Sequence, residues 1–192
     1  MNLPNQLTVA RLVLTGFFVA CFYTPWANAY SIALIVFSIA SITDYLDGSI
    51  ARSRGLVTNF GKLFDPLADK ILIAAAFILL SVDKVIPSWI TIAILSREFF
   101  VTGIRLIAAG RGAVLAAEKL GKHKMAWQII TVLYFLLRSA SAEPMFGFIR
   151  PWFAPSPVHD YIAAFIVGFT TLLTLGSGFS YFWKNRKLFD DA

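Results

Sequence analysis

Four of the eleven acidic residues in this 192-residue chain lie within 26 consecutive positions: Asp44, Asp47, Asp65 and Asp69. The first two are three residues apart and the last two are four apart, so in helices each pair occupies one face, about one turn apart. Two such helices can present all four carboxylates to one another. Ionised carboxylates held this close repel strongly unless a positive charge lies between them. The spacing therefore predicts a site for a counter-charge.

One or two divalent cations are the counter-charge that best suits four carboxylates. Hard ions such as Mg²⁺ and Mn²⁺ take carboxylate oxygens, keep some of their waters and leave positions open for the phosphate oxygens of a substrate. Zinc is a poor fit, because Cys21, His123 and His159 are scattered along the chain without the spacing of a metal site. We therefore expect magnesium or manganese, and phosphate chemistry.

The residues between the two aspartate pairs also suit a phosphate ligand. Gly48, Ala51 and Gly61 are small, which lets a ligand approach the backbone closely, and Arg52 can pair with a phosphate. Each residue type has an ordinary explanation, since aspartates often cap helices, glycines often serve helix packing and arginines often mark cytoplasmic helix ends. Those explanations do not account for all of them occurring together at these spacings.

The whole segment resembles the signature of the CDP-alcohol phosphotransferase family, D-x2-D-G-x2-A-R-x8-G-x3-D-x3-D. All eight fixed positions match: Asp44, Asp47, Gly48, Ala51, Arg52, Gly61, Asp65 and Asp69. The resemblance implies an enzyme in which an alcohol hydroxyl displaces CMP from a CDP-linked lipid. The four aspartates would hold the metals, and Asp69 would also take the proton of the acceptor. The lipid nucleotide would contact these positions: Asn5, Thr8, Asp44, Gly48, Ala51, Arg52, Thr58 and Gly61.

A second set of charged residues suits the acceptor. Arg97 and Arg105 are eight residues apart and lie within about 80° on a helix, and Arg97 falls in an apolar stretch where an uncompensated charge is costly. Glu98 is on another face and is not expected to pair with Arg97. Lys122 and Lys124 follow in a basic connection. An acceptor that carries a phosphate would explain this arrangement. Snorkelling side chains at a membrane edge are the alternative.

Four further motifs are similar to those of the family members that use sn-glycerol 3-phosphate as the acceptor. They are N-x-P-N-x-L-T-x-x-R at residues 2–11, D-P-L-A-D-K at 65–70, R-E-x-x-V-T-G-x-R at 97–105 and G-K-x-K at 121–124. This resemblance implies CDP-diacylglycerol as the donor, with phosphatidylglycerol phosphate and CMP as products. Met125 departs from the pattern, which has a threonine there. Asn5 and Thr8 have a simpler alternative role, as caps of the first helix.

The elements that position these residues are expected to be membrane helices. The chain is 58% apolar and 15% charged, with a mean hydropathy of +0.71, well outside the range of soluble domains. A spanning helix needs about 20 mostly apolar residues. Six apolar runs are separated by polar or Pro/Gly-containing breaks: residues 7–23, 30–46, 67–82, 87–108, 125–141 and 161–183. We predict an all-α integral membrane protein with six transmembrane helices, forming one domain over residues 1–192.

The distribution of lysine and arginine predicts which way the helices face, because positive residues are retained on the cytoplasmic side. Most of them fall at the two chain ends and in the second and fourth connections, whereas the other side holds Lys84, Arg138 and Arg150. Both termini should therefore be cytoplasmic, with the aspartates at the cytosolic membrane edge. The first apolar run followed by Ala27-Asn28-Ala29 imitates a cleavable signal peptide, but a retained first helix is the simpler interpretation.

Charge and composition also bear on partners and on rival functions. A net charge of +6 without a basic block of interleaved aromatics points to anionic lipids or phosphorylated ligands, not to nucleic acid. The alternatives left open are another acceptor (inositol phosphate, serine or phosphatidylglycerol), a divalent-cation transporter and a scaffold without enzymatic activity. The family resemblance implies a homodimer. A bacterial plasma membrane is expected, because no Arg/Ser-rich transit segment precedes the first apolar run.

Overall fold

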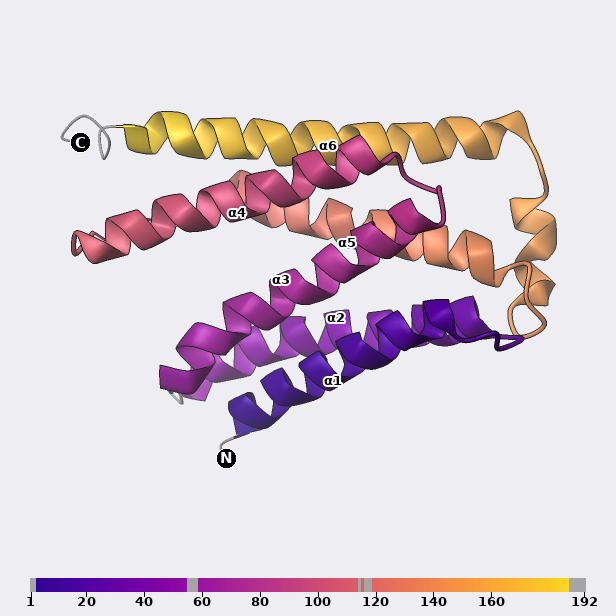
Figure 1. Ribbon diagram of the computed structural model, residues 1–192, viewed down its shortest axis with the longest axis horizontal. Coiled ribbons are helices and arrows are strands. Elements are labelled where there is room, and N and C mark those ends of the chain that lie inside the picture. Colours follow the sequence, from indigo (N-terminus) through magenta and orange to yellow (C-terminus); the bar gives the residue numbers. More distant parts are fainter. Residues whose placement is uncertain (1–2, 55–58, 114, 116–118, 187–192) are drawn as a thin grey trace.

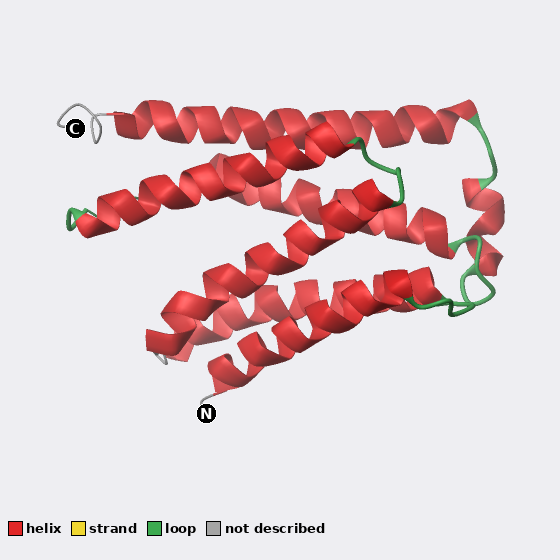
Figure 2. Cartoon of the chain, viewed as in Figure 1, coloured by secondary structure: helices red, strands yellow, loops and turns green. Residues whose placement is uncertain are grey.

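The computed structural model describes residues 3–54, 59–113, 115 and 119–186, and the side chains of these except 3–5, 7, 44–54, 59–69 and 119. Within these ranges every regular element is a helix, turns and loops join them, and Figure 2 contains no strand there. The elements are α1 Leu3–Tyr23, α2 Ala29–Arg54, α3 Asn59–Val82, α4 Ser88–Gly110, α5 Lys119–Ala140, the 3-10 helix η1 Gly147–Phe153, and α6 Pro157–Asn185.

Each of the six predicted apolar runs corresponds to one α-helix, but three helices extend well beyond their apolar run. α2 continues to Arg54, α3 begins at Asn59 and α5 begins at Lys119. Hydropathy detects only the apolar part of a helix, whereas backbone hydrogen bonding continues into polar sequence. The aspartate pairs therefore lie on helices, as expected. Lys122 and Lys124 were predicted to lie in a connection, and this was wrong because they belong to α5.

The predicted external loop between the fifth and sixth apolar runs contains η1. Pro151 lies inside η1, and because proline has a fixed φ and no backbone N–H, it is compatible with a short 3-10 segment but not with the interior of a longer α-helix. α6 then begins at Pro157, because Ser156 caps it by accepting a hydrogen bond from the Val158 backbone N–H and proline is favoured at the first helical position.

The bundle places the functional helix ends together. Figure 1 shows the start of α1, the end of α2, the start of α3, the end of α4 and the end of α6 towards one end of the molecule. η1 and the α1–α2 and α3–α4 turns lie towards the other. α1 packs against α2 and α3, α2 against α5, and α6 against both α4 and α5. Buried apolar side chains fill the interior, among them Phe18, Phe37, Phe77, Leu80 and Leu136.

Many large apolar side chains face outward. Exposed examples on the last helix include Phe165, Leu172 and Phe179, and contiguous apolar surface of this kind is rare on water-soluble monomers. By length and apolar composition, α6 is the one described helix that could cross a membrane by itself. Shorter apolar helical stretches are Thr8–Tyr23, Ala29–Thr43 and Lys70–Val82. The all-helical architecture is confirmed, and six spans stay a prediction.

Hydrogen bonds between polar side chains join α5 to α6. The hydroxyls of Thr131 and Thr170 lie 2.8 Å apart, and the Gln128 amide donates to the Thr174 hydroxyl at 3.4 Å. All four residues are buried. In an apolar environment such bonds, together with close packing, are what hold neighbouring helices side by side. We call these four residues the α5–α6 seam.

A carboxylate fixes the end of α2 that is remote from the aspartates. Glu143 accepts hydrogen bonds from the backbone N–H of Tyr30 at 2.8 Å, from that of Ser31 at 2.7 Å, and from the Ser31 hydroxyl at 2.6 Å. These N–H groups belong to the first turn of α2, where helices leave donors unsatisfied and favour negative charge. Glu143 therefore anchors the start of α2 to the segment after α5.

Candidate active site

The four aspartates lie on two helices, in the second half of α2 and the first half of α3, whose joined ends are close in space. Asp44 and Asp47 are in the last part of α2, and Asp65 and Asp69 are in the first part of α3. Residues 55–58 join these helices, and Figure 1 shows the two helix ends beside each other. A set of carboxylates at helical spacing on adjoining helix ends is suited to hard divalent cations. The backbone thus places the two aspartate helices next to each other, which a metal site shared by the four aspartates requires.

The aspartate side chains themselves lie outside the described residues, as do several others predicted to bind the nucleotide: Asn5, Gly48, Ala51, Arg52 and Gly61. Thr58 lies outside the described residues altogether. Among the side chains that are described, no group of three or more His, Cys, Asp or Glu gathers in a metal-binding arrangement. The roles of these residues stay predictions.

Thr8 and Arg11 lie on α1 about one turn apart, and each is only 2% exposed. Because α1 already begins at Leu3, Thr8 is inside the helix, and its interpretation as a helix cap is wrong. Arg11 was counted among the charges that mark the cytoplasmic side, but its side chain is buried in the bundle. Both side chains are therefore interior polar groups of the α1–α3 region, where α1 packs against the two aspartate helices.

A pocket at the middle of α3 collects the predicted acceptor residues. Its volume is about 220 Å³, and its lining comes from α3, α4, α5 and α6: Lys70, Arg97, Glu98, Val101, Thr102, Arg105, Gly121, Lys122, Lys124, Met125 and Tyr181. All four residues predicted to bind the acceptor are among them. With five cationic side chains and one carboxylate, the pocket favours an anionic ligand. We call it the cationic pocket.

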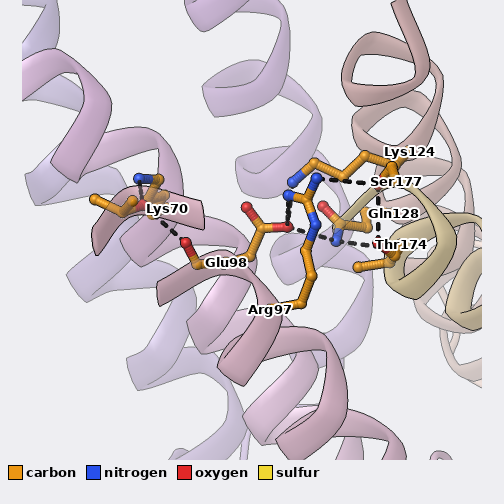
Figure 3. Close-up of polar contacts among 8 residues, drawn as sticks. Lys70, Arg97, Glu98, Lys124, Gln128, Thr174 and Ser177 are labelled. Atoms are coloured by element: carbon orange, nitrogen blue, oxygen red, sulfur yellow. Dashed lines mark hydrogen bonds and ion pairs between the residues drawn. The ribbon is translucent and has the colours of Figure 1, made fainter. Parts of the chain in front are cut away.

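Glu98 is the centre of the charge network in the pocket (Figure 3). One of its oxygens accepts from the Lys124 ammonium, from an Arg97 guanidinium nitrogen at 3.2 Å and from the Gln128 amide at 3.4 Å. The expectation that Glu98 does not pair with Arg97 was wrong. Adjacent residues start from different helix faces, but the long arginine side chain bends back far enough to reach its neighbour. Arg97 and Glu98 are only 9% and 13% exposed, so the pairing compensates two buried charges.

The final helix contacts both arginines. Arg97 donates a hydrogen bond to the Ser177 hydroxyl at 3.0 Å. The Arg105 Nε donates to the Tyr181 hydroxyl at 3.2 Å, and its guanidinium carbon lies 5.3 Å from the centre of the Tyr181 ring. These distances correspond to hydrogen bonds and to a cation–π contact. α6 therefore forms one wall of the cationic pocket.

Lys70 connects the pocket to the aspartate helices. It follows Asp69 directly in α3, and its ammonium donates to the Thr102 hydroxyl of α4 (Figure 3). No role was predicted for Lys70 from the sequence. Its position directly after the last aspartate, near the start of an apolar run, could have marked it as a candidate site residue. Glu98 offered a weaker signal, as a charge inside an apolar run. Tyr181 offered none, because it is 76 residues from Arg105 in the chain.

The sequence matches the CDP-alcohol phosphatidyltransferase family over residues 1–175. The chain belongs to this family. The resemblance inferred from the aspartate signature is thereby confirmed. CDP-alcohol phosphatidyltransferases are membrane-associated and generally depend on divalent metal ions. The matched region contains both aspartate helices and Arg97, Arg105, Lys122 and Lys124, while the end of α6 lies beyond it.

Several relatives within the family are similar to this chain over most of its length. A Bacillus subtilis protein is 42% identical over 196 residues, covering 96% of this chain and 95% of its own. A Rickettsia felis protein is 34% identical, covering 98% and 97%, and a Salmonella typhimurium protein is 34% identical, covering 71% and 78%. Each of the three is named CDP-diacylglycerol–glycerol-3-phosphate 3-phosphatidyltransferase.

Proposed function

We propose that this protein transfers the phosphatidyl group of CDP-diacylglycerol to sn-glycerol 3-phosphate, giving phosphatidylglycerol phosphate and CMP. One observation carries the choice of acceptor: Arg97, Arg105, Lys122 and Lys124 line a single pocket that is connected to the aspartate helices through Lys70. A pocket with this excess of cations suits an acceptor that is itself a phosphate ester. Serine carries no phosphate group, so it would not account for the number of cations in the pocket. The names of the relatives agree with this acceptor.

The donor site is proposed at the aspartates. Two Mg²⁺ or Mn²⁺ ions would be held there by Asp44, Asp47, Asp65 and Asp69. Such ions, when bound, neutralise the charge of the pyrophosphate and favour departure of the nucleotide. The nucleotide itself would be contacted from α1, α2, the 55–58 segment and α3 by Asn5, Thr8, Asp44, Gly48, Ala51, Arg52, Thr58 and Gly61. The burial of Thr8 on the face that packs towards α2 and α3 is in keeping with this role.

The reaction requires one proton acceptor, for which we propose Asp69. A hydroxyl oxygen of glycerol 3-phosphate forms a bond to the phosphatidyl phosphorus, and the bond from that phosphorus to the bridging oxygen breaks. CMP leaves with the electron pair, and the hydroxyl proton passes to the Asp69 carboxylate. Lys70, the next residue, lines the cationic pocket. An acceptor whose phosphate is bound there would hold its free hydroxyls near Asp69, which is the alignment that transfer needs.

We further propose that the chain is one membrane domain of six spans with both termini in the cytoplasm. The helix ends that carry most of the basic residues gather at one end of the bundle together with the aspartates. That arrangement agrees with retention of positive charge on the cytoplasmic side. It would place the active site at the cytosolic edge of a bacterial plasma membrane. Homodimerisation is proposed from the family resemblance alone.

The test is CMP release by detergent-purified protein supplied with CDP-diacylglycerol and Mg²⁺. Glycerol 3-phosphate, inositol phosphate and serine are compared as acceptors. We expect release with glycerol 3-phosphate alone, and loss of release in Asp69→Asn and in the presence of a chelator. Asp160→Asn is the matched control, since this exposed carboxylate pairs with Arg138 far from the site. Release with serine would refute our assignment of the cationic pocket, and release with inositol phosphate would refute the choice of glycerol 3-phosphate. Release that survives Asp69→Asn would refute the role of Asp69 as base.

A further inference from the structure

Three residues near the end of α6 lie against the two arginines of the cationic pocket: Ser177, Gly178 and Tyr181. Tyr181 is four residues after Ser177 and three after Gly178, so it lies on the same helix face as each of them. All three are buried. They lie beyond the part of the chain that matches the family.

Gly178 has no side chain, and the Arg97 side chain occupies the space where one would lie. A Cβ atom built at Gly178 would lie 2.6 Å from Cγ of Arg97, 3.1 Å from its Nε and 3.4 Å from its Cδ. The first distance is far below van der Waals contact, so any larger residue must displace Arg97. The clash involves Cγ of Arg97, which lies close to the backbone of α4, and Arg97 is almost fully buried. The guanidinium group would have to move as well.

Ser177 and Tyr181 orient the two guanidinium groups. The Ser177 hydroxyl donates its own hydrogen to the Thr174 carbonyl at 2.8 Å, which leaves its oxygen free to accept from Arg97. The Tyr181 hydroxyl accepts from the Nε of Arg105, and the ring lies under the guanidinium. With Nε engaged, the terminal nitrogens of Arg105 can still bind a phosphate.

We infer that Ser177, Gly178 and Tyr181 are positioning residues that determine how tightly the acceptor phosphate is bound. The inference rests on the proposed function, because it names the pocket's ligand as a phosphate ester. Arginine recognises phosphate through a rigid planar fork, and its binding is lost when that fork is displaced. The α6 face therefore acts on acceptor affinity through Arg97 and Arg105 without touching the donor.

The test compares Gly178→Ala with Gly176→Ala. Both variants add one methyl group to α6 and change helix propensity equally, but a Cβ at Gly176 meets nothing within 4 Å. The KM values for glycerol 3-phosphate and CDP-diacylglycerol are measured together with kcat. We expect Gly178→Ala to raise the KM for glycerol 3-phosphate about tenfold, the effect of weakening one charge-assisted hydrogen bond. The KM for CDP-diacylglycerol should stay unchanged, and Gly176→Ala should match the unmodified protein.

Binding of inorganic phosphate to the purified protein, followed by calorimetry, gives a readout that does not depend on turnover. Weaker binding in Gly178→Ala than in Gly176→Ala supports the inference, and equal binding overturns it. If the unmodified protein releases no CMP with glycerol 3-phosphate, the proposed function fails, while this titration still decides the inference. If Gly178→Ala does not fold, Tyr181→Phe and Ser177→Ala replace it. Each should weaken phosphate binding several-fold, and unchanged binding in both overturns the inference.

Discussion

Replacing Glu98 by glutamine should destabilise the protein strongly, and a phosphate ligand should restore much of the loss. Glutamine keeps the shape of the side chain but removes the charge that compensates Arg97 and Lys124. Those two side chains are 9% and 12% exposed. Leaving a buried charge without its partner costs about 3–5 kcal/mol. The open pocket gives water some access, so we take the lower value, about 3 kcal/mol. In a chain of this length that lowers Tm by about 6–12 °C.

The assay is thermal unfolding of the detergent-purified protein with and without inorganic phosphate. Asp160→Asn is the control, because it also removes one carboxylate from an ion pair. The Arg138–Asp160 pair is 35% and 73% exposed with a nitrogen–oxygen distance of 3.0 Å. Exposed pairs contribute about 0–1 kcal/mol, so Tm of this variant should fall by about 4 °C at most.

Phosphate should raise Tm more in Glu98→Gln than in the unmodified protein, because the bound anion takes over the role of the missing carboxylate. Two results would refute the reasoning. One is a Tm for Glu98→Gln that equals that of Asp160→Asn, which would mean that the pocket cations need no counter-charge. The other is equal stabilisation by phosphate in both proteins, which would mean that the anion binds elsewhere.

Three further predictions concern other parts of the molecule. Lys70→Met should lower kcat/KM for glycerol 3-phosphate about tenfold or more, because it removes a cation of the pocket and the contact with Thr102. Steady-state kinetics measures kcat/KM, and an unchanged value would contradict the role of Lys70. Glu143→Gln should lower Tm by about 2–8 °C through loss of roughly 1–2 kcal/mol at the start of α2 while the KM values stay unchanged; altered KM values would argue against a purely structural role. Chelation by EDTA should abolish CMP release, and added Mg²⁺ or Mn²⁺ should restore it; release that persists in EDTA would exclude the proposed metal site.

Local sequence patterns predicted the helices and the grouping of the predicted acceptor residues. The apolar runs located the six α-helices of the described residues, because long apolar runs between polar or Pro/Gly-containing breaks favour helices. The spacing of Arg97 and Arg105 put both on one face of α4, and the structure places both in the cationic pocket. These features depend only on helix geometry, which a single sequence reveals.

Contacts between distant segments could not be predicted in this way. Ser177 lies 80 residues from Arg97 and Glu98 lies 26 residues from Lys124. Which residues meet depends on how α4, α5 and α6 pack, and nothing in the local pattern specifies that packing. The pairing of Arg97 with Glu98 was missed for another reason. Side-chain length allowed a contact that α-carbon positions on the helix do not suggest.

The α5–α6 seam has a consequence for how the protein is made. α6 follows the other described helices in the chain and is therefore synthesised after them, and its apolar length would let it enter a membrane unaided. It can then join the rest by forming the hydroxyl and amide contacts with Gln128 and Thr131. The helices that carry the aspartates are synthesised in the first half of the chain. A nascent chain would therefore complete the aspartate helices before the cationic pocket, and the proposed phosphate affinity would arise only once α6 has been synthesised.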